Sequence, residues 1–87
     1  MNYYVYILIN INNSRNQTYV GYTKNLSNRL KLHNTSKGAK FTRGRLWKII
    51  YKKSYRTKSL AMSNEIKLKN NKKKRLKIKK NYLKKVL

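Results

Sequence analysis

The sequence predicts a small mixed α/β domain, and three observations support this prediction. The chain has 87 residues, which allows one domain with a small core, because short chains bury only about 60% of their unfolded surface. Three apolar segments have the β-branched and aromatic composition of strands. Three other segments are predicted to be helices. Two of them follow polar capping residues, and in the third the leucines recur at helical spacing.

The first two strands are expected to form a hairpin. Residues 3–10, YYVYILIN, have almost no polar interruption, which is typical of a central strand buried on both faces. Residues 11–16 are rich in Asn and have the composition of a turn, and residues 17–23, QTYVGYT, return as the second strand.

The remaining elements follow in order. Asn25 can cap a helix over residues 26–34, and a basic loop with Gly38 and Gly44 fills residues 35–45. Residues 46–55 form the third strand, and Thr57 or Ser59 caps a second helix that ends near residue 68.

The C-terminal segment, residues 67–87, predicts a third helix with a solvated basic face. It is dense in lysine, and Leu76, Leu83 and Leu87 recur at wide, helix-compatible spacing. Three other interpretations remain open, namely a charged surface helix without a binding role, a disordered tail and a nuclear-import signal.

The charge points to a polyanionic partner. Lys and Arg number 24 against one acidic residue, for a net charge of +23, and phosphate backbones are the obvious partner for such a chain. Compositional bias and attraction to anionic membranes are the alternatives. The chain has no cysteine, and no apolar run reaches the length of a membrane span, so we expect a soluble, cytoplasmic protein.

One helix brings an arginine and a histidine to face the hairpin. At about 100° per residue, Leu26, Leu30 and His33 share one side of the first helix, and Arg29 flanks them. Arg29 offers a planar fork of donors to phosphate oxygens, and His33 can donate to a phosphate or carry a proton. A surface arginine and a structural histidine are the alternatives.

The only carboxylate side chain, that of Glu65, is predicted to point inward. On helical geometry it lies about 40° from Ala61 and about 60° from Met62 and Leu68. Because an anionic residue is rarely buried without a partner or a metal, we favour a metal ligand. A buried ion pair with one of the many cations is the alternative.

The motifs resemble those of the GIY-YIG nuclease superfamily. The first strand has VYI at residues 5–7 and the second has YVG at 19–21, where the family has Gly-Ile-Tyr and Tyr-Ile-Gly. The helical arginine, the histidine and the glutamate of the family fall on Arg29, His33 and Glu65. Residues 38–45, GAKFTRGR, look like the loop of the small single-domain bacterial group and of nucleases that act on branched DNA.

This resemblance implies a three-stranded antiparallel sheet flanked by helices, with a nuclease domain over residues 1–77 and a basic tail over 78–87. Val5 stands where the family has its first glycine, which tightens a backbone position at the entry to the strand. The resemblance also implies Tyr19 as general base, Arg29 as stabiliser of the phosphoryl oxygens, and Glu65 as ligand of one Mg²⁺ or Mn²⁺ ion. Tyr6 would orient water or phosphate, and His33 would assist.

General chemistry agrees with these roles. Phosphodiester hydrolysis needs an activated water, neutralised phosphoryl oxygens and a stabilised leaving oxygen. A single carboxylate excludes a two-metal site built from side chains. A tyrosine with a pKa near 10 is a poor base at neutral pH, so we expect the dense positive charge to favour phenolate. Ordinary packing in the sheet is the alternative role for Tyr6 and Tyr19.

The functional prediction is a divalent-metal-dependent DNA endonuclease that prefers branched or flexible DNA. The alternative is a catalytically weak nucleic-acid-binding module that uses the same cleft on DNA or RNA, and a protein partner that supplies specificity fits either. The predicted phosphate contacts are Lys37, Lys40, Arg43, Arg45, Lys72, Lys73, Lys74 and Arg75.

Overall fold

The computed structural model describes residues 2–12, 14–35 and 40–86. Its elements are β1 (Tyr3–Asn10), β2 (Thr18–Thr23), α1 (Leu26–Asn34), the 3-10 helix η1 (Lys40–Thr42), β3 (Trp47–Tyr55), α2 (Lys58–Asn70) and α3 (Lys72–Val86). The strands form one antiparallel sheet in the order β2-β1-β3. The predicted fold class and the central position of the first strand are therefore confirmed.

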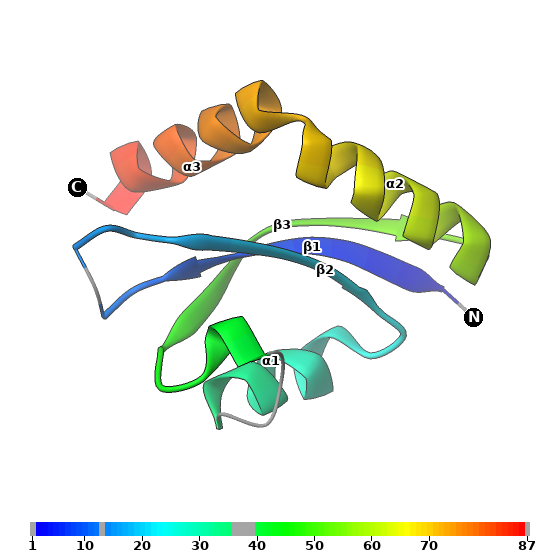
Figure 1. Cartoon of the computed structure of the whole chain (residues 1–87), viewed down its shortest axis with the longest axis horizontal. Coiled ribbons are helices and arrows are strands. Elements are labelled where there is room, and N and C mark those ends of the chain that lie inside the picture. Colours follow the sequence, from blue (N-terminus) through cyan, green and yellow to red (C-terminus); the bar gives the residue numbers. More distant parts are fainter. Residues whose placement is uncertain (1, 13, 36–39, 87) are drawn as a thin grey trace.

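The sheet lies between two helical layers. α1 and η1 cover one face, and α2 and α3 cover the other (Figure 1). β1 is buried without a break from Val5 to Asn10, because it has a neighbour at each edge and helices over both faces. Val5 is 1% exposed and lies within the strand, so its side chain is part of the core.

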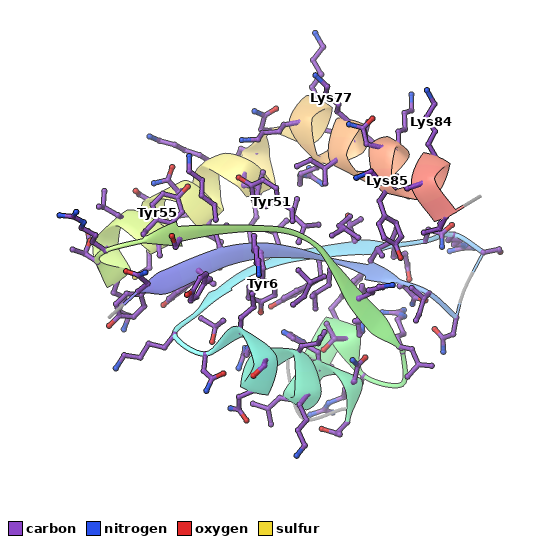
Figure 2. The ribbon with its side chains drawn as sticks, turned by 180° about the vertical axis from the view of Figure 1, so that it is seen from behind. Tyr6, Tyr51, Tyr55, Lys77, Lys84 and Lys85 are labelled. Carbon is purple, nitrogen blue, oxygen red and sulfur yellow. The ribbon has the colours of Figure 1, made fainter. Side chains whose placement is uncertain are left out.

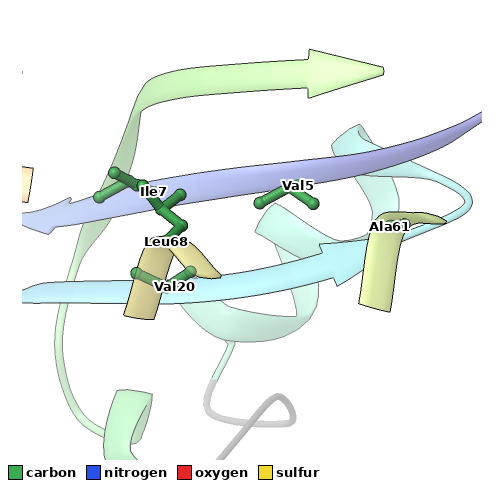
Figure 3. Close-up of a cluster of buried hydrophobic side chains, with 5 residues drawn as sticks. All are labelled: Val5, Ile7, Val20, Ala61 and Leu68. Atoms are coloured by element: carbon green, nitrogen blue, oxygen red, sulfur yellow. The ribbon is translucent and has the colours of Figure 1, made fainter. Parts of the chain in front are cut away.

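Alternate residues of β1 form two separate cores. Val5 and Ile7 pack with Val20 of β2 and with Ala61 and Leu68 of α2 (Figure 3). On the opposite face, the buried side chains are Tyr6, Leu8 and Trp47, and α1 contributes its leucines Leu26 and Leu30. The side-chain period of two along a strand thus divides the sheet into an α2 face and an α1 face.

Polar caps set the starts of two helices. The Asn25 side-chain oxygen accepts a hydrogen bond from the backbone N–H of Asn28 at 3.1 Å, and Thr57 Oγ1 accepts one from Leu60 N–H at 3.1 Å. Asn25 is the predicted cap, and of the two candidates for α2 it is Thr57 that serves.

The C-terminal helix begins later than the sequence predicts. α2 continues to Asn70, and Asn71 then interrupts the helical run before α3 starts at Lys72. Asn71 ends one helix and starts the next, since its N–H donates to the Leu68 carbonyl and its side chain accepts from Lys74 N–H. A prediction based on lysine density and leucine spacing overlooked this double cap.

α3 is an ordered helix, so the disordered-tail interpretation is wrong for the residues up to Val86. No residue of α3 is fully buried, and partly buried Ile78 packs against the core of the α2 face. Leu76 is 43% exposed, so it does not anchor the helix, and Leu87 lies outside the described residues. Within the described ranges, no helix combines the length and apolar character needed to cross a membrane.

Candidate active site

Tyr6 of β1 lies against Gly21 of β2, and the glycine leaves space for its ring. The two residues are opposite partners in the antiparallel ladder. A Cβ added to Gly21 would lie 2.5 Å from the Tyr6 hydroxyl oxygen and 3.1 Å from a ring carbon of Tyr19. Any side chain at position 21 would therefore displace one of these tyrosines.

A buried chain of hydrogen bonds holds the Tyr6 hydroxyl. Its oxygen lies 2.9 Å from His33 Nε2, and His33 Nδ1 lies 2.8 Å from Thr42 Oγ1. Burial lowers the pKa of His33 to about 4, with the Arg29 charge adding to the effect, so the imidazole is neutral at pH 7. Tyr6 then donates to Nε2, and Nδ1–H donates to Thr42.

The burial of His33 favours a structural role over direct contact with a phosphate. Its side chain is fully buried and both ring nitrogens have partners. The geometry suits a residue that positions Tyr6 and gives His33 no direct access to a phosphate.

Three of the predicted site residues influence the ionisation of Tyr6. Burial raises the pKa of Tyr6 to about 12, while a hydrogen bond from Arg29 and its positive charge oppose the rise. The negative charge of Glu65 and the neighbouring Tyr19 both add to it. The electrostatic effects of Arg29, Tyr19 and Glu65 thus converge on one hydroxyl, although α1 and α2 lie on opposite faces of the sheet.

Arg29 offers an unused donor beside a hollow at one end of β2. Among the described residues, its Nε is buried and has no hydrogen-bond partner. The hollow, here called the Arg29 hollow, has a volume of about 440 Å³ and is lined by Tyr3, Tyr22, Thr23, Lys24, Arg29 and Lys58. Arg29 and two lysines thus line one hollow, and this grouping suits an anion such as a phosphate.

Tyr19 lines a second hollow at the other end of β2. This Tyr19 hollow has a volume of about 280 Å³ and is lined by Thr18, Tyr19, Val20, Phe41, Lys69 and Arg75. The Tyr19 ring stacks on Phe41 with centroids 6.3 Å apart and lies 5.1 Å from the His33 ring. Tyr19 is only partly buried, whereas Tyr6 is 1% exposed.

Glu65 is partly exposed and paired. Its side chain is 14% exposed, and its Oε1 lies 3.3 Å from Nζ of Lys69, one helical turn later. Ala61 and Leu68 beside it are buried as predicted, but Met62 is 43% exposed. The buried face of α2 is therefore narrower than the sequence predicts. The sequence allowed either a metal ligand or a buried ion pair at Glu65. The structure contains an ion pair, and its lysine, Lys69, is half-exposed.

The carboxylate nevertheless fits one divalent ion. Mg²⁺ in proteins is commonly held by one or two carboxylates together with waters and substrate phosphates. Glu65 is partly exposed, its charge raises the pKa of Tyr6, and among the described residues its one ion-pair partner is the half-exposed Lys69 side chain. A carboxylate with one flexible partner can exchange that partner for a cation.

The predicted phosphate contacts divide between several surfaces. Lys40 and Arg43 are exposed at η1, and Arg45 donates to the Phe41 carbonyl and lies over its ring, 4.8 Å from the centroid. Lys37 lies outside the described residues. In the run 72–75, Lys72 is exposed, Arg75 lines the Tyr19 hollow, while Lys73 and Lys74 line other cavities.

Several residues of this region were not predicted as site residues. Phe41 is 45% exposed beside Tyr19, and a lone aromatic residue within a basic loop was the available signal. Thr42 holds His33 from a loop that has no periodicity to indicate it. Lys24, Lys58 and Lys69 line the two hollows, and nothing distinguishes them in sequence from the other lysines.

Known proteins with similar sequences and structures agree with this architecture. A family model described as the GIY-YIG catalytic domain matches residues 2–81. A UPF0213 protein of Oceanobacillus iheyensis is 48% identical over 69 residues, which are 77% of this chain and 76% of that protein. A UPF0213 protein of Streptococcus pneumoniae is 49% identical over 55 residues, and the match covers 62% of this chain and 56% of that protein.

A solution NMR structure shows the same fold. The UPF0213 protein of Bacillus halodurans is 38% identical to this chain with a TM-score of 0.50, covering 87% of this chain and 82% of that one. The family match spans nearly the whole chain and includes both strand motifs, Arg29, His33 and Glu65. The chain therefore belongs to the GIY-YIG domain family, among relatives named UPF0213.

Proposed function

We propose that the protein is a DNA endonuclease that hydrolyses phosphodiester bonds along the outer edge of β2 with the help of one divalent ion. The observation that carries this proposal is Arg29, which lines the Arg29 hollow beside two lysines and acts on the Tyr6 hydroxyl. An arginine held next to a tyrosine hydroxyl is well suited to the oxygens of a reacting phosphate.

The path of the nucleic acid follows from β2 being an edge strand. The Arg29 hollow lies at one end of β2 with Lys24 and Lys58, and the Tyr19 hollow lies at the other with Lys69 and Arg75. Cations at both ends of the edge support a backbone that runs along it. Lys40, Arg43, Arg45 and Lys72 would add phosphate contacts around this path, whereas Lys73 lines a cavity together with Lys77 and Lys84.

Tyr19 is the proposed general base. It is the tyrosine that lines a hollow, so its hydroxyl can approach an attacking water, whereas burial and the pKa of about 12 make Tyr6 unsuitable. Tyr19 and Arg29 line different hollows, but both neighbour Tyr6, which lies between them in the site. Tyr19 would take the proton from the water, and Arg29 would bind the phosphoryl oxygens as their charge grows. Tyr6 would hold Arg29 in place through their hydrogen bond, and His33 would hold Tyr6.

Glu65 would hold Mg²⁺ or Mn²⁺, in exchange for its contact with Lys69. When bound, such an ion stabilises the charge that develops on the leaving oxygen. The single carboxylate supports one ion completed by substrate phosphates, and a chain with a net charge of +23 should bind it weakly without nucleic acid. We extend the proposal to a cytoplasmic location, which the lack of cysteine supports.

A catalytically weak nucleic-acid-binding module is the second candidate. The ion pair between Glu65 and Lys69 favours it, because a carboxylate that keeps this partner would not bind a metal. The same hollows and cations would then bind DNA or RNA without cutting it.

A cleavage assay separates the two functions. The purified chain is incubated with Mg²⁺ or Mn²⁺ and with linear, flapped and four-way-junction DNA and structured RNA, with chelator in a parallel set. Internal cuts in DNA that require the metal are the expected result. Binding to every substrate without cleavage of any would overturn the endonuclease proposal in favour of the binding module.

A further inference from the structure

A second groove lies between β3 and the two helices that cover the α2 face. One cavity of about 230 Å³ is lined by Val5, Tyr51, Tyr55, Asn64, Lys67, Leu68, Asn71 and Lys74. An adjoining cavity of about 240 Å³ is lined by Ile50, Tyr51, Ile78, Asn81, Tyr82 and Lys85. Tyr51 lines both cavities, which follow one another along β3 and are together called the β3 seam.

Three tyrosines follow the length of the β3 seam. Tyr55 and Tyr51 come from β3 and lie on its α2 side (Figure 2), and Tyr82 comes from α3. All three are partly buried, so each ring is anchored in the fold while part of it stays accessible. Fixed aromatic rings in a row are the elements on which successive unpaired bases stack.

A lysine accompanies each tyrosine. Lys53 Nζ lies 5.7 Å from the centroid of the Tyr55 ring, Lys74 Nζ 5.5 Å from that of Tyr51, and Lys48 Nζ 5.9 Å from that of Tyr82. These distances are at the outer limit of a cation–π contact, and a lysine side chain is flexible. Each ammonium can therefore turn to a phosphate and leave the ring face to a base.

The charge of the β3 seam calls for an anionic occupant. Lys67, Lys74 and Lys85 line it from the helices, and Lys48 and Lys53 of β3 lie beside the rings of Tyr82 and Tyr55. The single acidic residue of the chain pairs with Lys69, which is not among the lining residues. Like charges that lie near one another repel, and a bound polyanion would relieve that repulsion.

The β3 seam is distinct from the β2 edge but connected to it at one point. β2 and β3 are opposite edges of the sheet, with β1 between them. At the start of α3, Lys74 lines the β3 seam, while the next residue, Arg75, lines the Tyr19 hollow. Consecutive cations thus face the two grooves from the two sides of the junction between α2 and α3.

We infer that the β3 seam binds an unpaired DNA strand, with bases on Tyr55, Tyr51 and Tyr82 and phosphates on the lysines. A paired duplex offers phosphates but keeps its base faces stacked inside, so it would not use the tyrosines. Combined with the proposed function, on which this consequence rests, the seam selects substrates in which a single strand adjoins the phosphodiester that is cut.

Two charge variants of the full chain test the inference. Lys74→Glu with Lys85→Glu reverses two charges that line the seam, and Lys77→Glu with Lys84→Glu reverses two on the same helix that do not line it. Lys77 and Lys84 point away from the sheet in Figure 2. Affinity for a fluorescent oligothymidylate and for a duplex of the same length is measured by anisotropy in chelator, so that no cleavage occurs.

The seam variant should lose at least about fivefold more affinity for the single strand than the outward variant does, because stacked bases add to the phosphate contacts. For the duplex, the two variants should differ little. Equal losses for the single strand would overturn the inference, since the binding would then depend on net charge alone.

Two substitutions of Tyr82 give a second test, in which the charge of the protein does not change. Tyr82→Leu removes the aromatic face and should weaken binding of the single strand by about fivefold or more, whereas Tyr82→Phe keeps the face and should bind like the parent. A Tyr82→Leu protein that folds and binds like the parent would contradict stacking. Oligoribouridylate is run beside the DNA, and tighter binding of RNA than of DNA would overturn the assignment to DNA.

The outcome is separable from that of the cleavage assay. A protein that binds single strands through the seam but cuts nothing overturns the endonuclease proposal and leaves the seam intact. A protein that cuts DNA while its seam and outward variants bind alike overturns the seam alone.

Discussion

The Tyr6 hydroxyl and His33 Nε2 lie 2.9 Å apart in a buried hydrogen bond that joins the central strand to α1. Neither group is exposed to water, and Thr42 occupies the other nitrogen of the imidazole. The pair therefore fixes Tyr6 beside Arg29 before any substrate arrives. Because it depends on a neutral histidine, its stability should depend on pH.

Acid should destabilise the fold through His33. The pKa of His33 is about 4 in the folded protein and near 6.5 in an unfolded chain, so between these values the unfolded state binds an extra proton. The contribution of His33 to the free energy of unfolding is therefore fully present above about pH 6.5. It is lost as the pH drops towards 4, which lowers the free energy of unfolding by about 3 kcal/mol at most. Thermal melting from pH 8 to pH 4 measures this fall.

His33→Gln provides the control, because an amide can make hydrogen bonds but does not titrate. The chain contains one acidic residue, so carboxylates contribute little to the acid transition. The variant should melt lower than the parent at pH 8 and lose much less stability on acidification. Parallel losses in the two proteins would show that another group is responsible.

Gly21→Ala should disturb Tyr6 specifically. The new Cβ would lie 2.5 Å from the Tyr6 hydroxyl oxygen and 2.7 Å from Cζ, and overpacking of this kind costs about 1–3 kcal/mol. We expect a lower melting temperature, shifted NMR signals of the His33 ring and loss of cleavage.

Gly44→Ala is the matched comparison. Gly44 has a φ of +69° and no atom within 4 Å of an added Cβ, so alanine there strains the backbone without touching the site. It should lower the melting temperature and leave the His33 signals in place. If Gly21→Ala also leaves them in place, the close approach of Gly21 and Tyr6 is not what holds the tyrosine.

Removing the Tyr19 hydroxyl should affect chemistry more than stability. Tyr19→Phe keeps the ring that stacks on Phe41 and removes the proposed base, so cleavage should fall by about 10² or more with little change in melting or DNA affinity. Tyr6→Phe removes a partner of buried His33 and should also cost about 1–3 kcal/mol of stability. A Tyr19→Phe protein that cuts at the parent rate would exclude Tyr19 as the base.

The salt dependence of duplex binding should identify phosphate contacts one at a time. Each contact contributes about −0.9 to the slope of log affinity against log salt, so Lys72→Gln should make the slope shallower by about that amount. Lys31→Gln removes an exposed charge of α1 that lines neither hollow and should leave the slope nearly unchanged. Equal slopes for all three proteins would exclude Lys72 as a contact.

The fold could be predicted where a strong local pattern, such as an apolar run or a capping residue, marks an element. The unbroken apolar run of β1 indicated a central strand, and Asn25 marked the start of α1. The break at Asn71 was not predicted, because an asparagine between lysines resembles any other polar residue of a helical surface. Only its two hydrogen bonds, one to each helix, show that it separates α2 from α3.

The sequence indicated which way two of the candidate side chains face, but not which partners they have. Helical spacing placed His33 on the inner side of α1, but its burial between Tyr6 and Thr42 depends on η1, whose approach no local pattern indicates. Helical spacing also placed Glu65 between Ala61 and Leu68 without showing that Lys69 would pair with it. Contacts between distant segments, and choices among many similar lysines, require coordinates.

The role of Glu65 depends on whether its carboxylate acts on its own or only through Lys69. The ion pair is partly exposed and joins residues four apart, so losing it should cost only about 0.3–0.5 kcal/mol. Glu65→Gln and Lys69→Gln both break the pair, but only the first removes the carboxylate. The two variants should therefore melt alike, and Lys69→Gln should lower cleavage far less than Glu65→Gln.

The most direct test of a metal-assisted nuclease at the β2 edge is the cleavage rate of Glu65→Gln with saturating Mg²⁺, measured beside its melting temperature and DNA affinity. We predict a fall of about 10² or more in the rate, with melting nearly unchanged and DNA affinity equal or slightly higher, because an anion near the phosphates has gone. A stable Glu65→Gln protein that cuts as fast as the parent would contradict the assignment.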